Sequence, residues 1–191
     1  MNVIHITVEY LRERQPPAVR FLHILILCLV LSQILVSNFM GFAPNGEISA
    51  DTVEHYATWI HICTGLLLLP VVFVFICIEL KRHGMKYFFP YVYRDFSQLK
   101  EDFRQLKQFE LPEPNDYGMA TVVQGLGLGA LALVVLSGFA WFLSWTVASP
   151  WAHTIKEVHE SLTGLIEAYV IGHGTMGILH VLLQVKHQKS R

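Results

Sequence analysis

The chain has 191 residues, of which 53% are hydrophobic and 15% are charged, whereas ordinary soluble domains carry roughly 25% charged residues. The length suits a single domain over residues 1–191, and the formal net charge of −1 gives no electrostatic basis for a nucleic-acid partner. Composition therefore argues against an ordinary soluble domain and favours an all-α integral membrane protein.

Four long stretches nearly free of charge follow one another along the chain, and each has the roughly 20 residues that a bilayer-spanning helix needs. They predict a four-helix bundle with transmembrane spans at about residues 19–40, 53–80, 118–145 and 156–185. A soluble bundle is the alternative, but buried core helices rarely sustain more than about 14 apolar residues. The first stretch follows a polar segment and lacks a small-residue cleavage site, so we interpret it as a span and not as a signal peptide.

The connection between the second and third spans has a helical pattern of its own. Apolar residues recur there at helical spacing, at Phe96, Leu99, Phe103, Leu106 and Phe109. The opposite face of that helix is strongly charged. We therefore expect an amphipathic helix that lies on the membrane surface.

Basic residues indicate the orientation of the four spans. Thirteen of the 14 lysines and arginines lie in the N-terminal arm, in the connection between spans two and three, and in the C-terminal tail, and Lys156 is the exception. Because four crossings put these three regions on one face, the positive-inside rule predicts that both termini and the amphipathic helix are cytoplasmic.

Five of the ten histidines lie within or at the edge of the spans: His23, His61, His159, His173 and His180. An ionisable residue at membrane depth is costly and marks a functional site by default. The 14 residues between His159 and His173 rise about 21 Å and make nearly four whole turns, so both side chains project from one face. Alternating topology then sets His61 level with His159, and His23 level with His173, which predicts two facing pairs near the two membrane surfaces.

Two facing imidazoles suit axial ligation of a haem iron. Nearby glycines would leave room for a flat ring or for close helix packing: Gly65, Gly164, Gly172, Gly174 and Gly177. A zinc or copper site is the competing interpretation, but the pairs are too far apart to form one site and neither has an accompanying cysteine or carboxylate. No Cys-x-x-Cys-His motif occurs, so a haem would be bound non-covalently. Arg20 lies one turn before His23, where it is either a partner for a haem propionate or an ordinary interfacial arginine.

These residues resemble the bacterial di-haem cytochrome b superfamily, which includes prokaryotic cytochrome b-561 (superoxide oxidase) and the cytochrome b subunits of nickel-iron hydrogenase and formate dehydrogenase. The resemblance covers nearly the whole chain and is carried by Arg20 to His23, His61 to Gly65, Ser137 with Gly138, His159 and His173. It implies one haem b ligated by His23 and His173 on the cytoplasmic side. It also implies a second haem b ligated by His61 and His159 on the outer side.

The long, charged middle connection is more similar to the hydrogenase and formate dehydrogenase subunits than to the stand-alone oxidase. In the formate dehydrogenase type the segment before the third span helps to form a quinone pocket beside the inner haem, which makes Asn115, Tyr117, Gly118 and Gln124 candidate quinone residues.

The resemblance implies a multi-pass protein of the bacterial inner membrane, surrounded by lipid, that belongs to a respiratory chain. It would transfer electrons between quinone or quinol and a periplasmic redox protein or catalytic subunit, and an oligomer is compatible with that role. The alternative is a stand-alone superoxide:quinone oxidoreductase. A channel or a structural scaffold would leave the histidine arrangement unexplained.

Two further residues in the fourth span need an explanation. Glu167 is the only charged residue in the middle of a span, and it lies roughly 80° around the helix from His159. We expect it to face a neighbouring helix or partner subunit and not the haems, either as a proton-relay or quinone-linked carboxyl or as a protonated, hydrogen-bonded one. His180 lies about 10 Å beyond His173, and we expect it at the cytoplasmic interface, near haem propionates or a quinone headgroup, and not as a ligand.

Overall fold

The computed structural model describes residues 15–113 and 115–189. Within that part the regular secondary structure is helical apart from one isolated bridge between Phe42 and Ile48, which confirms the predicted all-α class. The elements are α2 (Pro17–Ser37), α3 (Thr52–His83), α4 (Met85–Phe88), the 3₁₀ helix η1 (Pro90–Tyr93), α5 (Ser97–Lys107), α6 (Met119–Thr146) and α7 (Ala152–Lys189).

Among the described helices, four are long and apolar enough to cross a membrane: α2, α3, α6 and residues Ala152–Leu183 of α7. At about 1.5 Å per residue, the 21 residues of α2 extend roughly 32 Å, close to the thickness of a hydrocarbon core of about 30 Å. The observed bounds of α3 and α6 lie within three residues of the predicted ones. In contrast, α2 ends three residues earlier than expected and α7 begins four residues earlier.

The helix ends follow from local chemistry. Pro17 occupies the first turn of α2, where its missing N–H costs nothing. Asp51 caps α3, because its carboxylate accepts hydrogen bonds from the N–H groups of Val53 at 2.9 Å and Glu54 at 3.2 Å. The same helix ends at Gly84, whose φ of 77° is one that residues with a side chain rarely adopt.

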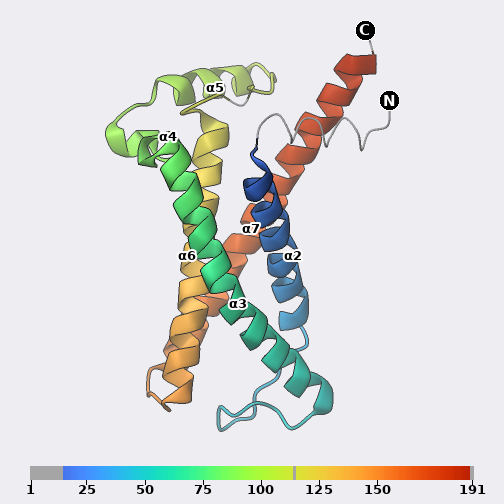
Figure 1. The fold of residues 1–191 in the computed structure, drawn as a ribbon, viewed down its shortest axis with the longest axis vertical. Coiled ribbons are helices and arrows are strands. Elements are labelled where there is room, and N and C mark those ends of the chain that lie inside the picture. Colours follow the sequence, from blue (N-terminus) through green and yellow to red (C-terminus); the bar gives the residue numbers. More distant parts are fainter. Residues whose placement is uncertain (1–14, 114, 190–191) are drawn as a thin grey trace.

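The long helices run alternately up and down (Figure 1). One end of the bundle, which we name the loop end, carries the α2–α3 and α6–α7 connections. The opposite end, which we name the terminal end, carries the start of α2, the end of α7 and the α4–η1–α5 segment. Within the bundle α6 packs against α7, α2 against α3, and α3 against α6.

The core lies where the four long helices meet. It consists of eight buried apolar side chains: Ile26, Val30, Leu68, Val72, Ala130, Leu131, Val134 and Ile166. The opposite surfaces stay apolar as well, since Phe73 is 68% exposed and Ile171 is 70% exposed. Large apolar side chains around the whole bundle are expected when lipid and not water surrounds it, because lipid does not drive them inward.

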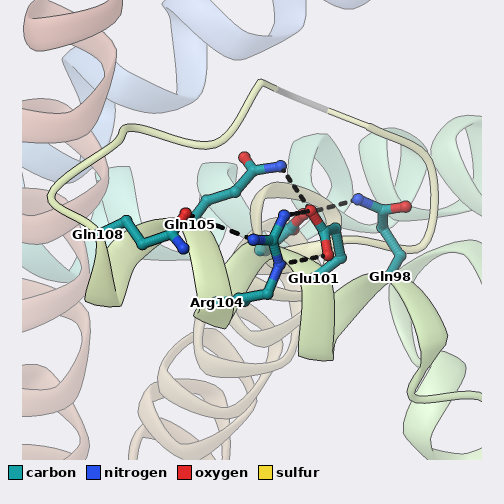
Figure 2. A network of polar contacts seen from close by, with 6 residues as sticks. Gln98, Glu101, Arg104, Gln105 and Gln108 are labelled. Carbon is teal, nitrogen blue, oxygen red and sulfur yellow. Dashed lines mark hydrogen bonds and ion pairs between the residues drawn. The ribbon is translucent and has the colours of Figure 1, made fainter.

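The connecting segment contains the helix that the apolar pattern predicts. The helix α5 lies inside the expected range, and its polar side carries a network around Glu101 (Figure 2). Arg104 donates two hydrogen bonds to the Glu101 carboxylate, at 2.6 and 2.9 Å, and Gln105 donates one at 3.1 Å. These hydrogen bonds, that of Arg104 first, lower the pKa of Glu101 to about 2. The apolar Phe103 is 55% exposed.

A contact that the sequence did not predict joins α5 to α6. Asp102 is only 2% exposed, and its carboxylate accepts a hydrogen bond from the N–H of Met119 at 2.6 Å. Gln98 donates a second hydrogen bond to it at 2.7 Å. A Cβ atom at Gly118 would lie 2.5 Å from this carboxylate, so only glycine allows the approach. The helix α5 therefore supplies the acceptor that the first turn of α6 needs.

We predict that Asp102→Ala destabilises the bundle, because the first turn of α6 loses its acceptor. Loss of a helix-capping carboxylate costs about 1 kcal/mol, which lowers the melting temperature of a protein of this size by roughly 2–4 °C. Thermal unfolding of the purified protein in detergent measures this shift. Asp102→Asn keeps an oxygen acceptor and should lose less, and Glu101→Ala on the exposed side should change little. Equal shifts in all three variants would contradict the capping role.

Candidate functional site

The first histidine pair lies toward the loop end of the bundle. His61 of α3 and His159 of α7 face each other, with ring centroids 6.4 Å apart and ring planes at 75°. The Nδ1 atom of His159 lies 3.0 Å from the hydroxyl oxygen of Ser137 in α6. All four long helices line the surrounding cavity of about 360 Å³, which we name the outer cavity.

The second pair lies toward the terminal end. His23 of α2 and His173 of α7 have ring centroids 6.2 Å apart, with planes at 61°. The ring of His173 stacks on Tyr169 at 5.1 Å, and that of His23 stacks on Phe75 at 6.3 Å. The surrounding cavity of about 710 Å³, which we name the inner cavity, is about twice as large as the outer one and lies in the range of known ligand sites, about 300–1,000 Å³.

The two cavities are neighbours. Val30 of α2 and Ile166 of α7 belong to the lining of both, and both side chains are part of the buried core. One layer of packed apolar side chains therefore separates two sites that each contain a pair of imidazoles.

The separation of the rings can be tested against axial ligation of one metal. Taking a metal–imidazole bond of about 2 Å and about 1 Å from the bonded nitrogen to the ring centre, two imidazoles on opposite sides of a metal have ring centres roughly 6 Å apart. The observed values of 6.4 and 6.2 Å agree with this distance. The Nδ1 atom of His61 is also buried without a hydrogen-bond partner among the described residues.

The donor set distinguishes haem from a simple metal ion. The described residues contain no group of three or more His, Cys, Asp and Glu side chains that could hold a metal ion. Zinc in proteins is nearly always four-coordinate, so a pair of imidazoles would leave half of its coordination shell open. Haem brings four equatorial nitrogens of its own and needs only axial ligands from the protein. The residues present therefore fit a haem in each cavity.

Only some of the glycines that were expected to leave room for a flat ring line the two cavities. Gly65 lines the outer cavity, and Gly174 and Gly177 line the inner one. Gly164 and Gly172 belong to neither lining, and open space lies beside both. Sequence reasoning missed Gly127, where an added Cβ would overlap the ring of Tyr169.

The candidate quinone residues do not all meet in one place. Gln124 lines the inner cavity. Tyr117 lies outside it, with its ring 6.1 Å from that of Tyr87 and the Nζ atom of Lys86 5.3 Å above its own ring. Asn115 holds the turn before α6, since its carbonyl accepts a hydrogen bond from Gly118 at 3.3 Å. The backbone at Tyr117 is left-handed, with a φ of 63°, and neither Asn115 nor Tyr117 belongs to the cavity lining.

Other polar residues of the inner site differ from the expected set. The half-buried Arg20 is absent from the lining, and its side chain makes no ion pair in the described part. Instead Glu79 lines the cavity and forms an ion pair with Arg82 at 2.7 Å. Sequence reasoning missed both Glu79 and Tyr169. The one-turn spacing from Tyr169 to His173 was a usable signal, because residues four apart share a helix face.

Glu167 is placed only in part as its angular position suggested. It is exposed, yet it belongs to the lining of the outer cavity together with Glu160 and Thr163. Glu167 reaches the lining because it lies two turns beyond Glu160, on nearly the same face of α7, and the outer cavity extends around the helix to that face.

His180 lies outside both linings, toward the terminal end. Its Nδ1 atom is 2.8 Å from the carbonyl oxygen of Met176, and its Nε2 atom is 3.5 Å from that of Pro112. It is therefore near the connection that precedes α6 and not opposite another histidine.

Comparison with known proteins gives one informative result. The model of a protein family described as prokaryotic cytochrome b561 matches residues 14–190. The match includes all four long helices and both histidine pairs. No curated protein and no solved structure gives a match.

We predict that the four paired histidines divide into two groups by haem loss. His61→Ala or His159→Ala should remove the haem of the outer cavity, whereas His23→Ala or His173→Ala should remove that of the inner cavity, because each iron loses one axial nitrogen. Haem content by pyridine haemochrome and the visible spectrum measure both. His180→Ala is the matched control and should keep both haems. Loss of the same haem in all four paired variants would refute the pairing.

Proposed function

Because the chain belongs to the prokaryotic cytochrome b561 family and is a membrane haem b electron-transfer protein, we propose that it holds two b haems and moves electrons between the quinone pool and a periplasmic redox partner. The observation that carries this proposal is the pair of imidazole sites, each with ring centres about 6 Å apart and joined by a shared cavity wall. A single haem would leave one of these sites unexplained.

The bound haems supply one-electron iron couples, and the chain supplies their ligands, their separation and an apolar environment. In this proposal His23 and His173 hold the inner haem, and His61 and His159 hold the outer one. The chemistry that the two pairs share is that of imidazole nitrogen, which in its neutral form is a good ligand for iron. Arg20, at the start of α2, is the proposed partner for an inner haem propionate.

The inner cavity is the proposed site of quinone or quinol. It is the larger of the two. Besides the histidine pair, its largely apolar lining includes the carboxylate of Glu79, the amides of Gln15 and Gln124 and the phenol of Tyr169. Apolar walls with a few polar groups are typical of sites for small organic molecules. Oxidation of a quinol releases two protons as well as two electrons, and Glu79 is a group in the lining that can accept a proton. Asn115 and Tyr117, the other candidate quinone residues, lie outside this lining.

The proposed orientation places the terminal end in the cytoplasm of a bacterium and the chain in its inner membrane. The support is the distribution of basic residues, which concentrate at that end. On the same basis α5 would lie on the cytoplasmic membrane surface, where the exposed Phe103 and Leu106 would enter the lipid and Arg104 and Lys107 would face its headgroups.

The loop end favours a protein partner over superoxide as the reactant there. Residues 38–57 and 147–163 carry five acidic side chains and the single basic residue Lys156. That lysine is already paired with Glu160 at 2.6 Å. A surface of net negative charge repels a small anion and slows its encounter. The stand-alone superoxide oxidase is therefore the less favoured function.

Two measurements on the purified chain test the function. We expect two non-covalent b haems per chain by pyridine haemochrome, and we expect a soluble quinol analogue to reduce them. Gln124→Leu should keep both haems but raise the KM for the quinol about fivefold, the effect of losing roughly 1 kcal/mol of hydrogen bonding. Asn115→Leu, outside the cavity lining, should change the KM less. One haem or none per chain would overturn the proposal, and rapid reduction by superoxide with no need for a partner would favour the alternative.

Orientation is tested separately in cells. The termini lie in residues 1–14 and 190–191, outside the described residues, so the fusion probes the predicted sidedness directly. A C-terminal fusion to a reporter that is active only in the cytoplasm should be active, and one to a reporter that is active only in the periplasm should not. The same reporters inserted between Asn45 and Gly46 at the loop end should give the opposite result. Periplasmic activity of the C-terminal fusion would reverse the assignment.

A further inference from the structure

One helix of the bundle contributes no histidine to either pair, yet it touches one of the four rings closely. This helix is α6, and the residues in contact are Ser137 and Gly138, both beside His159. We propose that Ser137 and Gly138 are positioning residues that fix the tautomer and the ring plane of His159 and thereby lower the potential of the outer haem. This inference rests on the proposed function, because it requires a haem between His61 and His159.

The hydrogen bonds around Ser137 determine which nitrogen of His159 carries the proton. A serine hydroxyl has a single hydrogen to donate, and that of Ser137 points to the carbonyl of Val134 at 2.9 Å. Its oxygen is therefore left to accept the Nδ1–H of His159 at 3.0 Å, and the backbone of Val134 is a second hydrogen-bond partner of the same histidine. A neutral imidazole with its proton on Nδ1 keeps the lone pair of Nε2 free, and that lone pair is what a metal requires.

Gly138 lets the ring reach this position. A Cβ atom built there would lie 2.9 Å from Cε1 of His159 and 3.3 Å from its Nδ1. Real Cβ contacts are not that short, so a side chain at residue 138 would displace the imidazole from α6. Ser137 thus fixes the proton on Nδ1 of His159, and Gly138 lets the His159 ring approach α6. Both residues come from the same turn of that helix.

The other three histidines lack this arrangement in the described part of the chain. His173 stacks on Tyr169, and His23 stacks on Phe75. The Nδ1 atom of His61 has no hydrogen-bond partner. His61 is hydrogen-bonded to the backbone of Gln33 and not to a side chain. Among the described residues His159 is therefore the one paired histidine whose ring is hydrogen-bonded to another side chain, and we expect a change at Ser137 to act on its site.

The expected direction of the effect follows from the bond. Donation of the Nδ1 proton raises the basicity of a metal-bound imidazole, which favours ferric over ferrous iron. Hydrogen bonding to an axial ligand is one of the means by which proteins adjust haem potentials. Removing the Ser137 acceptor should therefore raise the potential of the outer haem.

The test compares three variants by redox titration of the purified chain. Ser137→Ala should raise one of the two midpoint potentials by about 59 mV, the one-electron equivalent of a tenfold change in the ferric-to-ferrous equilibrium. Ser137→Thr keeps a hydroxyl and should restore the original value. Ser144→Ala is the matched control, because Ser144 makes the same type of hydrogen bond to a carbonyl three residues earlier, at 2.8 Å, two turns away from Ser137 on α6. The variant His61→Ala, which lacks the outer haem, identifies the potential that belongs to it.

Each outcome decides the inference. A shift of the outer potential alone, restored by threonine and absent in Ser144→Ala, supports it, as does loss of the outer haem from Ser137→Ala alone. Unchanged potentials in Ser137→Ala with both haems bound, or equal shifts of both potentials, would overturn it. If the unaltered chain itself binds fewer than two haems, the proposed function fails first, and the haem count made before the titration reveals that case.

Discussion

The pitch of a single helix constrains the whole arrangement. The helix α7 carries a histidine for each pair, and 14 residues of α-helix return the chain to nearly the same face after about 21 Å. The remaining helices must then bring one imidazole to each of two fixed levels, which α3 does at His61 and α2 does at His23. Antiparallel neighbours achieve this with side chains near opposite ends of the bundle, so the layer between them is free to be an apolar core. The apolar core therefore fills the space between the two histidine sites.

The two sites are alike in their imidazoles and unlike in almost everything else. The outer cavity is half the size of the inner one, and its His159 is hydrogen-bonded to Ser137 of α6. The inner cavity is bounded by stacked aromatic rings and by the carboxylate of Glu79. A small site with an oriented ligand suits a cofactor alone, whereas a site of about twice the volume has room for a second molecule. The asymmetry agrees with a protein that exchanges electrons with different reactants at its two ends.

The long helices and the two histidine pairs could be predicted from the sequence, because they follow from two local features, the length of each apolar stretch and the spacing of residues along one helix. Span length and the spacing of His159 and His173 depend on the helix alone, and they gave the helices and the levels of the pairs. The contacts of Asp102, Ser137 and Tyr169 depend on which helices approach and at what angle, so no local pattern revealed them. Tyr117 shows why contacts could not be predicted from sequence position alone. It lies directly before the third span, but its backbone is left-handed and its ring lies beside Tyr87 and Lys86 and not in the cavity. The lining position of Glu167 depends likewise on the width of a cavity.

The cap that Asp102 provides for α6 limits which segments of this protein can be exchanged in chimeras. The α4–η1–α5 segment is held to the bundle at two points, since Phe88 is 1% exposed and its carbonyl lies 2.7 Å from the place where a Cβ of Gly125 would be. The segment is therefore a structural part of α6 and of the inner cavity, and replacing it with a shorter connection would remove part of the cavity wall as well as a loop. Chimeras and fusion tags are better joined at residues 43–47, where the chain makes a tight exposed turn around Gly46.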